Sequence, residues 1–145
     1  MTVSLFWGKE EVQMQKAQYG ILRFAKYKGP EISNIEAHNE REKEKYASNP
    51  DIDNSRRNLN YHLIEPVGKY RAESNRLIEE YGCRTRKDSV RVVEVLITAT
   101  PEFFKGKKKS EIRAYFQTAL EFIKKYQDSE TILSAVVHMD EKTPH

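Results

Sequence analysis

Two histidines near the end of the sequence, His138 and His145, enclose two carboxylates, Asp140 and Glu141. Neutral imidazole and carboxylate groups are ligands for divalent ions such as Mn²⁺, Mg²⁺ and Zn²⁺. The segment 140–144 is polar and typical of a turn, and a strand–turn–strand arrangement would bring both rings to one edge of a sheet. Two histidines are nevertheless a modest signal, because a metal site usually has at least three protein ligands. The alternative interpretation of His138 is a histidine that simply ends a buried strand.

A second segment, residues 36–63, is rich in basic, amide and aromatic side chains that could contact a nucleic acid. Lysine and arginine contact phosphates, asparagine hydrogen-bonds to phosphates or base edges, and tyrosine stacks on unpaired bases. The candidates are Asn39, Arg41, Lys43, Lys45, Tyr46, Arg56, Arg57, Asn58, Asn60 and Tyr61. His38 lies in the same polar stretch, so it is not expected to be a core histidine. The alternative interpretation is a charged helix followed by a solvated loop.

The composition limits the class of protein to which these sites belong. At 145 residues the chain is expected to form one domain, and 38% apolar residues are enough for a core. The formal net charge of +3 permits a nucleic-acid partner without demanding one. A single cysteine, Cys83, excludes a disulfide framework within the chain and a cysteine-based zinc site. With no signal peptide and no apolar run of membrane-spanning length, we expect a cytoplasmic protein.

The elements that must position these residues follow from the apolar pattern and the turn signals. Alternating or continuous apolar residues predict strands over residues 13–25, 59–63, 91–98 and 131–138. The strand over 91–98 is mostly β-branched, so we expect it near the centre of a sheet, and the strand over 131–138 delivers His138 at its end. Helices are predicted in the second half of 31–47 and over 69–81 and 110–126. Gly82 is expected to end the second helix, and Thr100 and Pro101 to begin a helical segment after the central strand.

Four strings of residues are informative when taken together: HNERE at 38–42, DIDNSRRNLNY at 51–61, TRKDSV at 85–90 and HMDEKTPH at 138–145. In combination they resemble the Mob/Pre family, the MobV-type relaxases of plasmid mobilisation and recombination. They occur in the family's order, and the resemblance covers residues 14–145. It implies an α+β fold of the HUH-relaxase type, a central antiparallel sheet flanked by helices. It also implies a division into residues 1–13, an N-terminal extension or first strand, and residues 14–145, the relaxase catalytic domain.

The resemblance implies an activity: an endonuclease that nicks one strand at a plasmid origin of transfer and stays attached to its 5′ phosphate. His38 would be the nucleophile, and Tyr61 or Tyr46 its rival. Arg41 would steady the scissile phosphate, while Glu141 would be a base, an orienting group or a metal ligand. A divalent ion, Mn²⁺ or Mg²⁺, would be held by His138 and His145.

The resemblance also implies partners. Origin-of-transfer DNA would be bound both as a duplex repeat and as a single strand, with a conjugative coupling protein as a further partner. The residues expected to contact DNA are Asn39, Arg41, Arg56, Arg57, Asn60, Tyr61, Arg86 and Lys87.

The sequence departs from the family pattern at its last residue. The family motif continues to a further histidine, which would fall at position 147, on the same side of a strand as His145. Because the sequence ends at His145, we expect a catalytic domain that is incomplete at its C-terminal end and lacks its last strand or strands. The alternative function is therefore a truncated, catalytically inactive module that binds origin DNA.

Overall fold

A computed structural model describes residues 17–43 and 49–145 of the chain. The elements in chain order are β1 (Gly20–Lys28), α1 (Ile32–Asn39), β2 (Tyr61–Ile64), α2 (Tyr70–Glu80), β3 (Val90–Ala99), α3 (Pro101–Phe104), α4 (Lys109–Lys124) and β4 (Ala135–Val137). Short 3₁₀ segments, η1 (Gly29–Glu31), η2 (Asn54–Leu59) and η3 (Ser129–Thr131), join some of them. The proposed N-terminal segment 1–13 lies outside the described residues.

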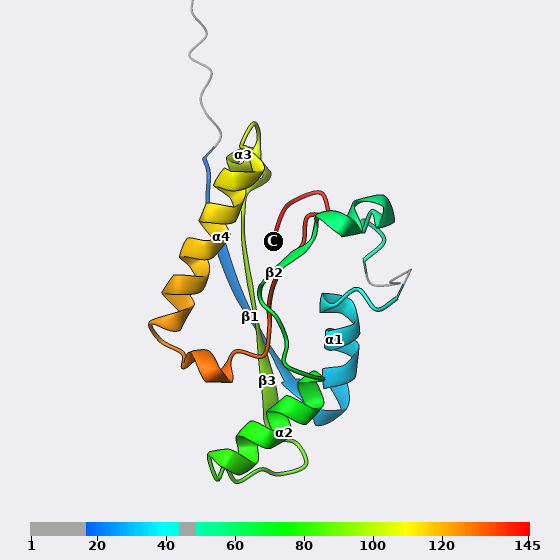
Figure 1. Cartoon of the computed structure of the whole chain (residues 1–145), viewed down its shortest axis with the longest axis vertical. Helices are drawn as coiled ribbons and strands as arrows, with labels where there is room; N and C mark the ends of the chain where they lie inside the picture. The colour runs from blue at the N-terminus through cyan, green and yellow to red at the C-terminus, as the bar shows by residue number, and fades with distance from the viewer. Residues whose placement is uncertain (1–16, 44–48) are drawn as a thin grey trace, which may run out of the picture.

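The strands form two antiparallel pairs. β1 pairs with β3 along its whole length, from Gly20 opposite Ala99 to Lys28 opposite Val90. β2 pairs with the short β4, with Tyr61 opposite Val137. Figure 1 shows α4 along one side of these strands, α1 on the other side and α2 at one end. The α+β class expected from the sequence is therefore confirmed.

The position of β3 differs in detail from the expected central strand. Within residues 17–43 and 49–145, β1 is the only strand that pairs with it. Along its other edge, the Thr98 hydroxyl donates a hydrogen bond of 2.6 Å to the carbonyl of Pro144. The segment that carries His145 thus lies beside β3, between the two strand pairs, and this contact links the pairs.

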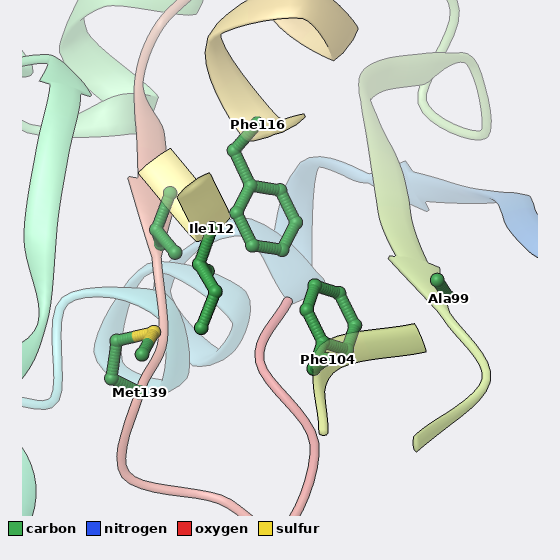
Figure 2. Packing of buried hydrophobic residues seen from close by; sticks show 6 residues of the cluster. Ala99, Phe104, Ile112, Phe116 and Met139 are labelled. Atoms are coloured by element: carbon green, nitrogen blue, oxygen red, sulfur yellow. The ribbon is translucent and has the colours of Figure 1, made fainter. Parts of the chain in front are cut away.

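The core lies between α4 and the ends of β3 and β4. Ile112 and Phe116 occupy the apolar face of α4, as their spacing predicts, and contact Ala99, Phe104, Val137 and Met139. Figure 2 shows these side chains converging from the helices and from the chain that follows β4. Burial of this cluster fixes the chain around residue 139, next to the first candidate ligand.

The position of α1 differs from the prediction, which placed the helix in the second half of 31–47; of that half, residues 40–43 are not helical and residues 44–47 lie outside the described residues. The helix occupies the first half because Ile32, Ile35 and Ala37 are the apolar residues that it can bury. It ends in a Schellman motif, with hydrogen bonds from Glu42 N to Ala37 O (2.9 Å) and from Arg41 N to His38 O (3.3 Å). Arg41 adopts a left-handed conformation with φ of 52°.

Other element ends agree better with the sequence. α2 also ends in a Schellman motif, and its left-handed residue is Gly82, with φ of 63°, as predicted. Pro101 begins α3, but the Thr100 side chain does not cap it, because its hydroxyl accepts a hydrogen bond from Tyr19 N. The strand expected over 131–138 is only three residues long, because residues 132–134 and His138 lie outside the stretch that pairs with β2. No helix in the described part of the chain is both long and apolar enough to cross a membrane.

Candidate metal centre and its surroundings

The structure brings together two histidines and one carboxylate at the end of the chain. One ligand atom from each of His138, Glu141 and His145 lies within 4.8 Å of the other two. Two backbone hydrogen bonds close the turn between the histidines, from His138 N to His145 O (2.6 Å) and from His145 N to His138 O (3.2 Å). The two rings therefore lie side by side because the main chain pairs there, as in a strand–turn–strand arrangement.

The hydrogen bonds of the two rings fix their tautomers. His138 Nε2 lies 2.7 Å from the carbonyl of Asn39, and His145 Nδ1 lies 3.2 Å from the carbonyl of Thr143. A carbonyl oxygen can only accept, so each of these nitrogens carries a proton. The opposite nitrogens, His138 Nδ1 and His145 Nε2, then present lone pairs to each other at 3.3 Å.

This donor set fits a divalent cation. Two facing imidazole lone pairs repel each other unless a positive charge lies between them. The Glu141 carboxylate lies 3.5 Å from His145 Nε2 and adds a hard oxygen ligand. Burial, with the nearby positive charge of Arg41, lowers the pKa of His138 to about 4, so its ring is neutral at pH 7 and able to ligate. In metal sites, the nitrogen of a histidine ligand that does not face the ion commonly donates to a carbonyl, which orients the ring, and the carbonyls of Asn39 and Thr143 accept from the two rings in the same way.

Arg41 ties the end of α1 to the two carboxylates. Its side chain is only 6% exposed. Its Nε and Nη2 donate to the Asp140 carboxylate (2.8 and 2.9 Å), Nη2 also to Glu141 (2.7 Å), and Nη1 to the carbonyl of His38 (2.7 Å). Every nitrogen of the guanidinium is thus engaged inside the protein. The geometry supports a role in holding Asp140 and Glu141, whereas the sequence suggested a contact with a phosphate.

Asp140 is the buried partner in this arrangement, with 0% of its surface exposed. Burial alone would raise the pKa of its carboxyl, but the hydrogen bonds and charge of Arg41 outweigh it and lower the pKa to about 2. Asp140 is therefore ionised at neutral pH, and the Arg41–Asp140 pair holds the turn that carries Glu141.

His38 lies in the last turn of α1, half-buried beside this centre. Its ring centroid is 6.4 Å from that of His138, with the ring planes nearly perpendicular. It lines one pocket together with Glu94, Thr98, Glu141 and His145. Burial lowers its pKa, and the charge of Arg41 acts in the same direction, so the ring is neutral at pH 7. The neutral His38 ring and two of the candidate ligands, Glu141 and His145, therefore line one open pocket, and the third candidate ligand, His138, is buried beside His145.

Asn39 and Asn60, two expected DNA contacts, have partners inside the protein. The Asn39 amide donates to Glu94 (3.0 Å), and the Asn60 side-chain carbonyl accepts from Met139 N (2.6 Å). Both therefore support the pocket, Asn39 through α1 and Asn60 through the chain after β4. Neither side chain is placed as a free hydrogen-bonding group on the surface.

Tyr61, the rival nucleophile, lies on the other face of the β2–β4 pair from His138. It is opposite Val137, and both pack against the core, whereas His138 follows one residue later and points the other way. Its hydroxyl is buried with no hydrogen-bond partner in the described residues, and burial raises its pKa. The Arg113 guanidinium covers its ring at 4.6 Å. Tyr46 lies outside the described residues.

The remaining expected DNA contacts are spread over the molecule. Arg56 is exposed in η2, and Arg57 beside it donates to the carbonyl of Lys43. Arg86 and Lys87 are exposed in the connection between α2 and β3, which Figure 1 places at the opposite end of the molecule from α3. The structure does not bring Arg86 and Lys87 to the pocket of His38.

Sequence reasoning missed a second polar cluster next to this centre. The Glu40 carboxylate contacts His62 Nε2 at 2.7 Å and accepts hydrogen bonds from Ser134 Oγ (3.0 Å) and the Tyr70 hydroxyl. Asp140 was expected only as part of the turn motif, not as the buried partner of Arg41. In the sequence, Glu40 could have been singled out because it belongs to the HNERE motif, between Asn39 and Arg41. It was overlooked because many other charged residues surround it.

Comparison with known proteins gives an independent view of the chain. The Mob_Pre family model, described as plasmid recombination enzyme, matches residues 16–145. A plasmid recombination enzyme type 1 of Staphylococcus aureus is 36% identical over 132 residues, which cover 88% of this chain and 32% of the relative. A plasmid recombination enzyme of Lactiplantibacillus plantarum is 37% identical over 131 residues, which cover 88% of this chain and 36% of the relative. The chain thus spans about a third of the length of these relatives.

Solved structures show the same likeness at the level of the fold. A Mn-bound crystal structure of the MobM relaxase domain (MOBV) with 22-nucleotide plasmid pMV158 oriT DNA and a 3′-thiophosphate has a TM-score of 0.80 and 32% identity. The match covers 88% of this chain and 67% of that chain. The same domain bound to 26-nucleotide pMV158 oriT DNA gives a TM-score of 0.68 at 26% identity. The relaxase-like fold expected from the sequence is confirmed by these matches.

Proposed function

Because the chain belongs to the Mob/Pre family of plasmid recombination enzymes, we propose that it carries the nicking centre of a plasmid mobilisation relaxase. The reaction would cut one DNA strand at an origin of transfer through a covalent bond to His38. The observation that carries this proposal is the shared pocket, in which a neutral His38 lies beside Glu141 and His145, whose donor atoms converge with a donor atom of the buried His138.

The substrate and the ion follow from the chemistry of the site and from its relatives. Two imidazoles and a carboxylate suit a borderline divalent ion, and the MobM relaxase domain was crystallised with both Mn and oriT DNA. We therefore assign Mn²⁺ as the expected ion and Mg²⁺ as the alternative. The DNA partner would be the plasmid's own origin of transfer, and the reaction would take place in the cytoplasm, where plasmid DNA resides.

The nucleophilic step uses the neutral ring of His38. One ring nitrogen attacks phosphorus, the bond from phosphorus to the 3′ oxygen breaks, and the 5′ phosphate stays on His38 as a phosphoramidate. The other ring nitrogen releases its proton, and one proton ends on the departing 3′ oxygen. A divalent ion held by His138, Glu141 and His145 would neutralise charge on a non-bridging phosphate oxygen. The reverse attack by the 3′ hydroxyl rejoins the strand without a nucleotide cofactor.

The other residues of the centre hold its geometry. Arg41 keeps Asp140 ionised and holds both Asp140 and Glu141 in place, and its bond to the carbonyl of His38 ties the nucleophile to the turn that bears the ligands. The Asn39 carbonyl holds the tautomer in which His138 Nδ1 is a lone-pair donor. A nucleophile and a metal centre from distant parts of the chain are thus connected by direct hydrogen bonds.

A nicking assay on supercoiled plasmid that carries the cognate origin, with Mn²⁺, tests this function. We expect the wild-type chain to produce a protein-linked open circle, and His38→Ala to lose both the nick and the link. Tyr61→Phe should nick at the wild-type rate, because its hydroxyl lies on the core face of β2. Mass spectrometry of the adduct should place the phosphate on His38. If His38→Ala still nicked the plasmid, or if Tyr61→Phe lost nicking, the assignment of His38 would be wrong and a tyrosine would be the nucleophile.

A second candidate function is an origin-binding module that does not cut. The observation behind it is that the described site supplies two imidazoles and one carboxylate, which is the minimum for a catalytic metal site. In that case the wild-type chain binds origin DNA in a gel-shift assay, yet the supercoiled plasmid remains closed at saturating Mn²⁺. Binding with nicking excludes this alternative.

A further inference from the structure

The last turn of α1 directs two neighbouring side chains to different parts of the fold. The Schellman motif reverses the chain at Glu40 and Arg41, and Arg41 reaches Asp140 and Glu141 in the turn after β4. Glu40 instead contacts side chains from β2, from α2 and from the segment before β4. The short piece of chain that carries His38 and Asn39 is therefore held at its end by two separate groups of contacts.

Glu40 is placed as an acceptor shared by three donors. Its carboxylate is 14% exposed and receives hydrogen bonds from the hydroxyls of Tyr70 and Ser134, beside the contact with His62 Nε2 at 2.7 Å. Burial would raise the pKa of Glu40, but these hydrogen bonds outweigh it and lower the pKa, so the group is a carboxylate at neutral pH. A carboxylate has enough lone pairs for all three partners, whereas an amide or an alkyl group does not.

What Glu40 fixes is the peptide directly before it. The carbonyl of Asn39 is the acceptor that holds His138 Nε2 at 2.7 Å and so keeps Nδ1 available as a ligand atom. His38 is one residue earlier in the same turn. A shift of the Glu40 backbone would therefore change both the orientation of a metal ligand and the position of the nucleophile, although Glu40 touches neither ring.

We propose that Glu40 is a positioning residue of this centre, which acts by locking the Asn39 carbonyl onto His138. The proposal rests on the metal centre described under the proposed function, but it can be measured without DNA cleavage. Groups behind metal-ligating histidines typically contribute about 10–100-fold to metal affinity or activity. Glu42 offers a matched control two residues further on, because its carboxylate is exposed and pairs with Lys69 on the surface.

The experiment compares wild type, Glu40→Ala and Glu42→Ala in the full chain. We expect Glu40→Ala to weaken Mn²⁺ binding, measured by calorimetry without DNA, by about tenfold or more. Its single-turnover nicking rate should fall by at least the same factor, while the Kd for an origin oligonucleotide stays within about threefold of wild type. Glu42→Ala should match wild type in all three measurements. Equal Mn²⁺ affinity in Glu40→Ala and Glu42→Ala would overturn the proposal.

Two milder variants keep the test decisive if Glu40→Ala does not fold. Tyr70→Phe and Ser134→Ala each remove one donor and leave the carboxylate in place. Each should reduce Mn²⁺ affinity by a smaller factor, and the double variant by more than either alone; unchanged affinity in the double variant contradicts the proposal. If wild type binds Mn²⁺ but does not nick, and Glu40→Ala still weakens Mn²⁺ binding, the nicking function fails while the positioning role stands.

Discussion

At the residue scale, Arg41 and Asp140 form an ion pair in which both charged side chains are buried. Two buried ions are costly to remove from water, and they are tolerated here because the guanidinium and the carboxylate share two hydrogen bonds. The remaining guanidinium hydrogen bonds go to Glu141 and to the carbonyl of His38. The pair therefore supports the turn that carries the candidate ligand Glu141 as well as the end of α1 that carries His38, and its removal should affect both the stability of the fold and the geometry of the candidate centre.

We predict that Asp140→Asn destabilises the chain by about 3 kcal/mol at pH 7, because the buried guanidinium loses the fully buried carboxylate that takes two of its hydrogen bonds and keeps only Glu141 as a charged partner. Urea unfolding measures this loss. The surface control is Asp51→Asn, whose carboxylate pairs with Lys142 in solvent, and it should cost less than about 1 kcal/mol. Equal losses in the two variants would show that burial of the Arg41–Asp140 pair contributes nothing to stability.

The same pair predicts the pH dependence of stability. The pKa of Asp140 falls from its ordinary value of 3.8 to about 2 in the folded state, so its contribution is present above pH 4 and is lost as the pH falls through about 2. The shift corresponds to a contribution on the order of 2 kcal/mol. Urea unfolding of wild type and Asp140→Asn should therefore give free energies of unfolding that differ less at pH 2 than at pH 5. A constant difference over that range would contradict the assignment.

At the element scale, α4 supplies most of the core that fixes the site. Its buried face contacts the end of β3 and the chain around Met139, one residue after a candidate ligand. The helix has a polar face as well, on which Phe122 is 48% exposed. Phenylalanine therefore occurs on both faces of α4, buried at position 116 and exposed at position 122. Substituting each one separates the effect of burial on stability from the effect of side-chain size.

We predict that Phe116→Ala lowers the free energy of unfolding by about 3 kcal/mol, because it leaves a cavity among Phe104, Ile112 and Met139. Phe122→Ala, on the exposed face, should cost less than about 1 kcal/mol. Chemical denaturation of both variants gives the comparison. Similar losses at the two positions would mean that the core does not lie where the structure places it.

The elements also show what the sequence could predict. β3 and α4 were predicted within about two residues because apolar periodicity is a local signal. α1 was misplaced because charged residues continue past its end, and only the burial of Ile32 and Ile35 decides where the helix lies. The contacts of Glu40 with His62, Tyr70 and Ser134 span 22, 30 and 94 residues, so no local pattern reveals them. By contrast, the turn from His138 to His145, which carries the candidate ligands, could be predicted because its residues are close together in the sequence.

At the scale of the whole molecule, the modest net charge of +3 conceals an uneven distribution of basic side chains. The connection from α3 to α4, together with the first residue of α4, carries four lysines within five residues, of which Lys105, Lys108 and Lys109 are exposed and Lys107 lies over the Phe103 ring. Phe103 contacts Tyr115, whose hydroxyl donates to the carbonyl of Thr98 beside the pocket. This basic connection is therefore linked by direct packing to the strand that borders the candidate centre.

If origin DNA is the partner, these lysines should contribute to its salt dependence. We predict that changing Lys105, Lys107, Lys108 and Lys109 to glutamine makes the plot of log affinity against log salt shallower, by up to about 0.9 for each DNA phosphate that a lysine no longer neutralises. Fluorescence anisotropy with a labelled origin hairpin measures this slope. Lys124→Gln with Lys125→Gln, at the other end of α4, is the matched control and should leave it unchanged. An identical slope in both variants would exclude DNA binding by the α3–α4 connection.

The left-handed conformation of Arg41 has a consequence for the evolvability of this position. α1 and α2 end in the same motif, but α2 uses Gly82 at the left-handed residue, whereas α1 uses a residue with a full side chain, at a backbone cost of about 1 kcal/mol. Glycine at position 41 would relieve that strain, but it would remove every hydrogen bond that the Arg41 side chain donates to Asp140 and Glu141. The backbone alone therefore favours glycine at this position, whereas the buried contacts of the side chain favour arginine, and the contacts outweigh the backbone because loss of the Arg41–Asp140 pair costs about 3 kcal/mol.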